Sequence, residues 1–164
     1  MIILARMQDN WNVPELKKDK VLCFMFAPKK RIVSELKFTK EHEWIRIEKE
    51  GEEEQRELAI VGISDFAQEQ LGDIVSIELP KAGGIFRQGQ TIAIVDSVKA
   101  SSDIYTPISG EIVAVNEELI EKPELINQSP YDSGWIARIK PSNTEEFENL
   151  MTKEKYDRYI GEIK

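Results

Sequence analysis

From Leu36 onward, apolar residues fall mostly in short runs of strand length that are separated by charged and turn residues. A period of two is the pattern of a β-strand with one buried face, and the runs are rich in Ile, Val, Thr and Tyr, which suit a pleated sheet. Two runs, Thr91 to Val95 and Ile104 to Ile108, flank one short connection. We expect them to pair antiparallel as a hairpin that displays Lys99 at its tip.

A second hairpin is predicted from Trp44 to Ile47 and from Leu58 to Ile63, which are joined by a charged turn. Glu52 to Glu54 give this turn an acidic tip, which we interpret as a solvated loop. An internal repeat follows, because the pattern of Gly72 to Ile77 recurs at Gly110 to Val115. The two copies flank the lysine hairpin and predict a strand in each half.

The segment 65–71 predicts a short helix. Ser64 or Asp65 can cap its start, and Gly72 can end it, because glycine readily adopts the backbone conformation that terminates a helix.

A second helical pattern covers Ser142 to Lys164, where apolar residues recur at a spacing of three and four. Ser142 and Glu145 predict a capping box at its start, and the charged stretch Lys153 to Lys155 can divide it into two pieces. We expect this segment to dock on the sheet and to cover apolar surface.

Composition narrows the possible functions. The chain of 164 residues has 22 basic and 30 acidic residues and a formal net charge of −8, which argues against nucleic acid as a partner because phosphate binding draws on clustered positive charge. Cys23 is the only cysteine and His42 the only histidine, so neither a zinc cluster nor a Cys/His catalytic pair is expected. No apolar run approaches the roughly 20 residues of a membrane-spanning helix.

Residues 1–33 differ from the rest of the chain. They hold seven basic and three acidic residues, whereas residues 34–164 hold 15 and 27. We expect residues 1–33 to be a disordered or loosely docked extension and residues 34–164 to be the functional domain. The alternatives are a start at Met25, which would make most of the extension an artefact of the gene boundary, and a mitochondrial leader. Against a leader, the segment contains acids and lacks serine.

The hairpin tip reads Asp96-Ser97-Val98-Lys99-Ala100 and resembles the lipoyl-attachment motif of the glycine cleavage system H protein. The resemblance spans roughly Ser34 to Lys164 in the family's order. Further matches are Lys40-Glu41-His42-Glu43-Trp44-Ile45, Val61-Gly62-Ile63-Ser64-Asp65, Gln70-Leu71-Gly72-Asp73-Ile74-Val75, Ser129-Pro130-Tyr131 and Gly134-Trp135. Biotin carriers and the lipoyl domains of 2-oxo acid dehydrogenases usually carry other residues beside their lysine.

The resemblance implies a mainly β fold, a barrel-sandwich hybrid of two small sheets with a short helix near 65–71 and one or more C-terminal helices. It also implies lipoate bound covalently as N6-lipoyl-lysine at Lys99, and a monomeric, non-catalytic carrier without a metal. The expected partners are the P, T and L proteins of glycine cleavage and a lipoate ligase or lipoyltransferase. Such a carrier takes methylamine from the P protein to the T protein. The residues that match the family's arm-docking cleft are Glu43, Asp103, Ile63 and Leu71.

Two other functions stay open from the sequence. The same Lys99 would serve a relay of lipoyl groups to 2-oxo acid dehydrogenases. A chain that is never modified would instead act as an acidic interaction module. The compartment expected is a bacterial cytoplasm, with mitochondria as the alternative.

Overall fold

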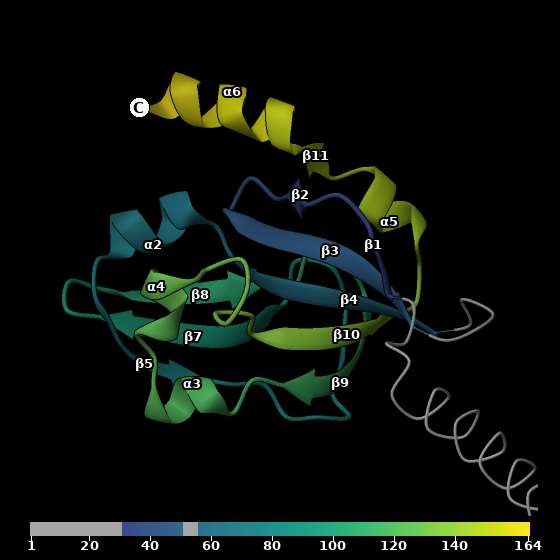
Figure 1. The fold of residues 1–164 in the computed structure, drawn as a ribbon, viewed down its shortest axis with the longest axis horizontal. Coiled ribbons are helices and arrows are strands. Elements are labelled where there is room, and N and C mark those ends of the chain that lie inside the picture. Colours follow the sequence, from purple (N-terminus) through teal and green to yellow (C-terminus); the bar gives the residue numbers. More distant parts are fainter. Residues whose placement is uncertain (1–30, 51–55) are drawn as a thin grey trace, which may run out of the picture.

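The computed structural model describes residues 31–50 and 56–164, and its strands form two sheets (Figure 1). The larger sheet has eight strands in the described parts of the chain, in the order β11-β2-β3-β4-β10-β9-β6 with β1 beside β3. The smaller sheet has the order β5-β7-β8. The predicted mainly β fold of two sheets is thus confirmed. Most of residues 1–33, and the acidic tip at Glu52 to Glu54, lie outside the described residues.

The strands of the larger sheet are β1 (Arg31–Val33), β2 (Lys37–Phe38), β3 (Glu43–Glu50), β4 (Arg56–Ile63), β6 (Ile85–Phe86), β9 (Gly110–Val115), β10 (Ala137–Pro141) and β11 (Met151–Thr152). Those of the smaller sheet are β5 (Ile74–Glu78), β7 (Thr91–Ser97) and β8 (Ser101–Tyr105). The helices are α2 (Asp65–Leu71), α3 (Glu118–Glu121), α4 (Leu125–Gln128), α5 (Glu145–Glu148) and α6 (Lys153–Ile163). Both predicted hairpins are present as β3–β4 and β7–β8, and the two copies of the repeat lie on β5 and β9.

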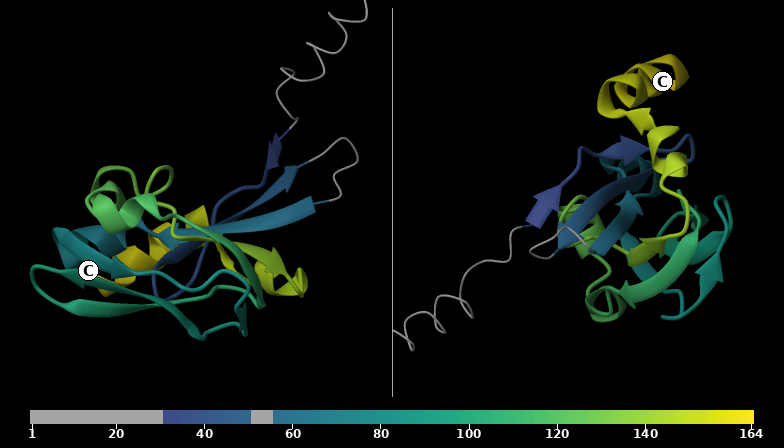
Figure 2. Two further views of the ribbon diagram at one scale, coloured as in Figure 1. Left: turned by 90° about the horizontal axis from the view of Figure 1, so that it is seen from below. Right: turned by 90° about the vertical axis from the view of Figure 1, so that its right-hand side faces the viewer.

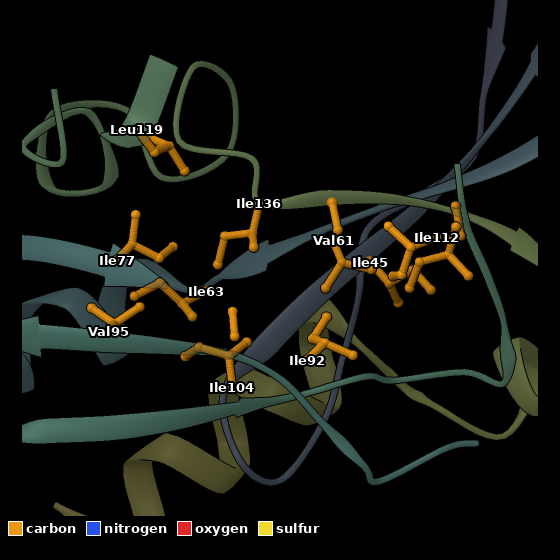
Figure 3. Close-up of a cluster of buried hydrophobic side chains, with 14 of the residues drawn as sticks. Ile45, Val61, Ile63, Ile77, Ile92, Val95, Ile104, Ile112, Leu119 and Ile136 are labelled. Atoms are coloured by element: carbon orange, nitrogen blue, oxygen red, sulfur yellow. The ribbon is translucent and has the colours of Figure 1, made fainter. Parts of the chain in front are cut away.

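The main core fills the space between the two sheets, and Figure 3 shows its β-branched side chains pointing toward one another from both. Ile45 and Val61 come from the larger sheet, and Val95 and Ile104 from the smaller one, each almost fully buried. Leu119 of α3 closes this core beside β5. Along β4, every second residue faces this core, namely Ala59, Val61 and Ile63.

A second, smaller core lies on the outer face of the larger sheet, where the C-terminal segment packs. Tyr156 of α6 is 2% exposed and stacks on Phe38 with 4.3 Å between ring centroids. Trp44 lies over Gly62, where a Cβ would come within 2.7 Å of the indole ring, and its Nε1 donates to the carbonyl oxygen of Pro130. Only glycine leaves room for this packing.

The C-terminal segment differs from its sequence prediction. It contains two helices separated by β11, and the break falls at residues 149–152, before the predicted Lys153 to Lys155. β11 forms because Met151 pairs with Phe38 of β2, and Thr152 then caps α6. The predicted capping box of Ser142 and Glu145 is wrong, because α5 begins after Thr144 without a side-chain cap.

The short helix α2 matches its prediction at both ends. Ser64 is its N-cap, and the Ser64 hydroxyl accepts a hydrogen bond from the backbone N–H of Ala67. Gly72 ends it with a φ of 77°, in the left-handed region that favours glycine. Figures 1 and 2 place α2, α3 and α4 at the same end of the molecule as the β7–β8 turn.

Candidate functional site

Lys99 lies in a tight turn that the neighbouring serine organises. The backbone N–H of Ser97 donates to the carbonyl oxygen of Ala100 at 2.8 Å, which closes the turn. The Ser97 hydroxyl oxygen accepts from the backbone N–H groups of Lys99 and Ala100 at 3.2 and 3.1 Å. The backbone at Lys99 is therefore fixed by several hydrogen bonds, although the residue is exposed.

The Lys99 side chain is available for chemistry. In the described chain no carboxylate forms an ion pair with its amine. Its stem lies across Gly72, where an added Cβ would be 3.4 Å from Cε of the lysine. Val98, beside it, is a 65% exposed apolar side chain. The turn thus presents an apolar residue and a free primary amine to solvent, which suits acylation by an enzyme that grips the hairpin from outside.

A cavity of about 510 Å³ opens near the far end of the same hairpin. Residues 38–41 and 43, 88–89, 105–107 and 149–151 line it, so the C-terminal segment forms one of its walls. Ser101 and Tyr105, the ends of β8, are separated by about 14 Å at roughly 3.4 Å per residue. β8 therefore connects the lysine turn to the cavity.

Glu43 is the buried carboxylate of this cavity, with 1% of its surface exposed. Its Oε1 accepts the backbone N–H of Tyr105 at 3.1 Å, and its Oε2 accepts the hydroxyl of Thr39. Burial raises the pKa of Glu43, because the charged form loses water, while the hydrogen bonds from Thr39 and Tyr105 act in the opposite direction. The carboxylate is thus held in one place and keeps lone pairs for a cationic partner.

His42, which precedes Glu43 in the chain, belongs to a hydrogen-bonded group that includes Tyr156 of the C-terminal helix α6. The Tyr156 hydroxyl lies 2.9 Å from Nδ1 of His42 and 2.7 Å from Oγ of Ser64. His42 has a φ of 75°, so the chain turns sharply just before Glu43. Burial lowers the pKa of His42 and raises that of Tyr156 to about 12, so both side chains are favoured in their neutral forms.

Of the four expected cleft residues, Glu43 alone lines this cavity. Ile63 pairs with Glu43 across β3 and β4, but it is 2% exposed and its side chain belongs to the main core. Leu71 is half-buried at the end of α2, next to Gly72 and the Lys99 stem. Asp103 is exposed on β8, two residues before Tyr105.

The sequence gives no signal for the residues that hold the Glu43 carboxylate in place. Thr39 stands four positions before Glu43, and the two residues meet across a turn. The spacing of residues along a strand or a helix does not predict such a contact. Tyr105 contributes through its backbone N–H, which every residue except proline possesses, so the sequence carries no signal for it. The wall formed by residues 149–151 depends on the pairing of β11 with β2.

Comparison with known proteins identifies the family. The model of the family described as "Glycine cleavage H-protein" matches residues 36–163. The chain belongs to this family. Its H proteins carry lipoate and act as carrier components of the glycine cleavage system. The resemblance stated from the sequence is therefore confirmed.

Individual relatives agree. The glycine cleavage system H protein of Halothermothrix orenii is 47% identical over 128 residues, which cover 78% of this chain and 94% of that protein. The H protein of Aeromonas hydrophila is 50% identical over 131 residues, or 80% of this chain and 97% of that protein. The crystal structure of a glycine cleavage system H protein from Mycobacterium marinum superposes with a TM-score of 0.67 at 34% identity, covering 82% of this chain and 98% of that one.

Within residues 31–50 and 56–164, no helix is long and apolar enough to cross a membrane. The same residues contain no group of three or more His, Cys, Asp or Glu side chains placed to hold a metal ion.

Proposed function

We propose that the protein is the lipoyl shuttle of a glycine cleavage system and that Lys99 carries lipoate as N6-lipoyl-lysine. It would accept the methylamine group of glycine from the P protein, deliver it to the T protein and be reoxidised by the L protein. The observation that carries this proposal is an exposed, unpaired lysine in a hydrogen-bonded hairpin turn of an H-protein family member. The bacterial relatives favour a bacterial cytoplasm as its compartment.

The residues of the turn fit attachment of an acyl group. The neutral amine of Lys99 attacks the carbonyl carbon of an activated lipoyl group held by a ligase or transferase. A C–N bond forms, the activating group leaves with its electron pair, and the amine loses a proton. Ser97 holds the backbone of the turn during this reaction, and Gly72 leaves room for the lysine stem. Once attached, lipoate supplies a disulfide that can be opened and closed.

The cavity gives the loaded arm a place away from water. A lysine side chain extended by a lipoyl chain can follow β8 for the distance between Ser101 and Tyr105. At the end of that path Glu43 would accept a hydrogen bond from the ammonium of the cargo, and Thr39 and Tyr105 would hold the carboxylate in position. Asp103, exposed on the same strand, would face the arm on its way.

The test is the intact mass of the protein isolated from its own host. We expect a fraction heavier by one lipoyl group, with the modification mapped to Lys99. Lys99→Arg should remove this fraction without loss of stability, because the residue lies in an exposed turn and a guanidinium is a poor acylation nucleophile. Lys81→Arg, at another exposed turn lysine, is the control and should remain modified. Absence of lipoyl mass in the native protein, or its persistence in Lys99→Arg, would refute the assignment.

A further inference from the structure

One side chain of α4 directs its hydrogen bonds to the connection between α2 and β5. The Asn127 amide oxygen accepts the backbone N–H of Ile74 at 2.9 Å. Its amide nitrogen donates to the carbonyl oxygen of Gly72 at 2.9 Å and to Oε1 of Gln68 at 3.0 Å. The two backbone groups belong to the residues on either side of Asp73. Asn127 therefore holds the two peptide groups that flank Asp73.

The connection of residues 72–74 contacts the lysine turn directly. The carbonyl oxygen of Asp73 accepts the backbone N–H of Val98 at 3.0 Å, and the stem of Lys99 lies over Gly72. One short connection thus touches the turn twice, once through its backbone and once under the lysine side chain. The views in Figures 1 and 2 agree that α2, α4 and the turn lie at the same end of the molecule.

We propose that Asn127 is a positioning residue for the acylation of Lys99. It fixes residues 72–74, and through the Asp73 carbonyl it fixes the orientation in which the turn offers the lysine to the modifying enzyme. This inference rests on the proposed lipoyl attachment. Asn127 contacts none of the reacting atoms, so it acts only through the connection that it holds.

A purely structural role for Asn127 can be separated from positioning by a matched residue. Asn116 is 6% exposed, and its amide nitrogen donates to the carbonyl oxygens of Ser133 and Trp135, both at 2.8 Å. It therefore also holds a loop through its side-chain amide. Neither of its partners belongs to the connection 72–74 that contacts the turn. Asn116→Ala removes the same kind of interaction without releasing that connection.

The experiment measures lipoylation of the unmodified full chain by a lipoate ligase with lipoate and ATP, at varied carrier concentration. We expect Asn127→Ala to lower kcat/KM about tenfold, mainly through a higher KM, since the apparent affinity falls with the fraction of molecules whose turn is aligned. Asn116→Ala should keep the parent value. Hydrogen exchange of the Val98 amide should accelerate in Asn127→Ala alone, because that N–H donates to Asp73.

The outcomes are distinct. If the parent is never modified, the proposed function fails, and the exchange of the Val98 amide still decides whether Asn127 holds the turn. If the parent is modified and Asn127→Ala matches it in both readouts, or if Asn116→Ala shows the same loss, the inference is overturned. Should Asn127→Ala not fold, Asn127→Asp replaces it. The aspartate keeps the acceptor for Ile74 but cannot donate to Gly72, so the same direction is expected.

Discussion

Replacing Glu43 by Gln tests whether the cavity shelters a cationic cargo. Glu43 is 1% exposed, and each of its oxygens already accepts one hydrogen bond, from Tyr105 and from Thr39. Each oxygen can accept one more, so an ammonium that enters the cavity would meet a fixed acceptor with a negative charge. Glutamine keeps the shape and can still accept from Tyr105. The substitution therefore removes the charge with little change to the packing.

The expected effect follows from the strength of one charge-assisted hydrogen bond, about 1.5 to 3 kcal/mol. Because about 1.4 kcal/mol is a factor of ten in an equilibrium, the loaded arm of Glu43→Gln should leave the cavity at least about tenfold more often. Non-enzymatic loss of methylamine should accelerate by the same factor, since only the arm outside the cavity meets water freely. The oxidised arm without cargo has no cation and should be unaffected.

The assay loads the lipoylated carrier with P protein and glycine, removes the enzyme, and follows release of ammonia and formaldehyde. Glu78→Gln is the control, because Glu78 is an exposed carboxylate on β5 that does not line the cavity. Equal release rates from the parent and Glu43→Gln would refute the reasoning. Faster release from both variants would show that the change in the protein's net charge, and not the loss of the cavity carboxylate, causes the effect.

Three further predictions concern the same structure. Burial raises the pKa of Glu43, so the folded protein binds this proton more tightly than the unfolded chain, whose reference value is 4.5. The stabilisation from this proton is present at low pH and is lost as pH rises through the pKa of the folded protein. We therefore expect the melting temperature of the parent, relative to that of Glu43→Gln, to rise when the pH is lowered from 7 to 4.5. A difference that stays constant with pH would contradict this prediction. Tyr156→Phe keeps the ring stacked on Phe38 but removes the hydroxyl that bonds His42 and Ser64. Urea unfolding should then show a free energy of unfolding lower by about 1 to 3 kcal/mol. No loss relative to Tyr159→Phe would mean that the buried hydroxyl contributes nothing. One residue inserted between Val98 and Lys99 should sharply slow lipoylation, because it shifts the geometry of the turn. A normal rate would show that the ligase reads local sequence alone.

Local patterns in the sequence were sufficient for the elements that carry Lys99. Strands β7 and β8 carry Ile, Val, Thr and Tyr on either side of a short connection, and pairing of such strands leaves one possible place for the turn. The helix α2 could also be predicted from the sequence, because Ser64 and Gly72 act on backbone groups within a few residues of themselves. In both cases the decisive interactions are close in sequence.

The position of the break in the C-terminal segment could not be predicted in the same way. Residues 149–152 continue the helical spacing of apolar residues, so the charged stretch Lys153 to Lys155 is the expected place for a division. The extended conformation is selected by pairing of Met151 with Phe38, more than a hundred positions earlier in the chain. Such tertiary pairing overrides a local preference whose strength is a fraction of a kcal/mol per residue.

The residues that match the family's docking cleft include both Glu43, which lines the cavity, and Ile63, which packs in the main core. A match of residues places side chains in order along the chain, whereas the lining of a cavity depends on which distant segments come to lie beside each side chain. Glu43 and Ile63 lie directly opposite one another on adjacent strands, so their side chains share one face of the sheet. The Glu43 carboxylate reaches the backbone N–H of Tyr105 and lines the cavity, while Ile63 packs in the main core. The loaded arm would therefore contact Glu43 and the wall at residues 149–151, and substitutions at Ile63 should act on stability rather than on shelter of the cargo.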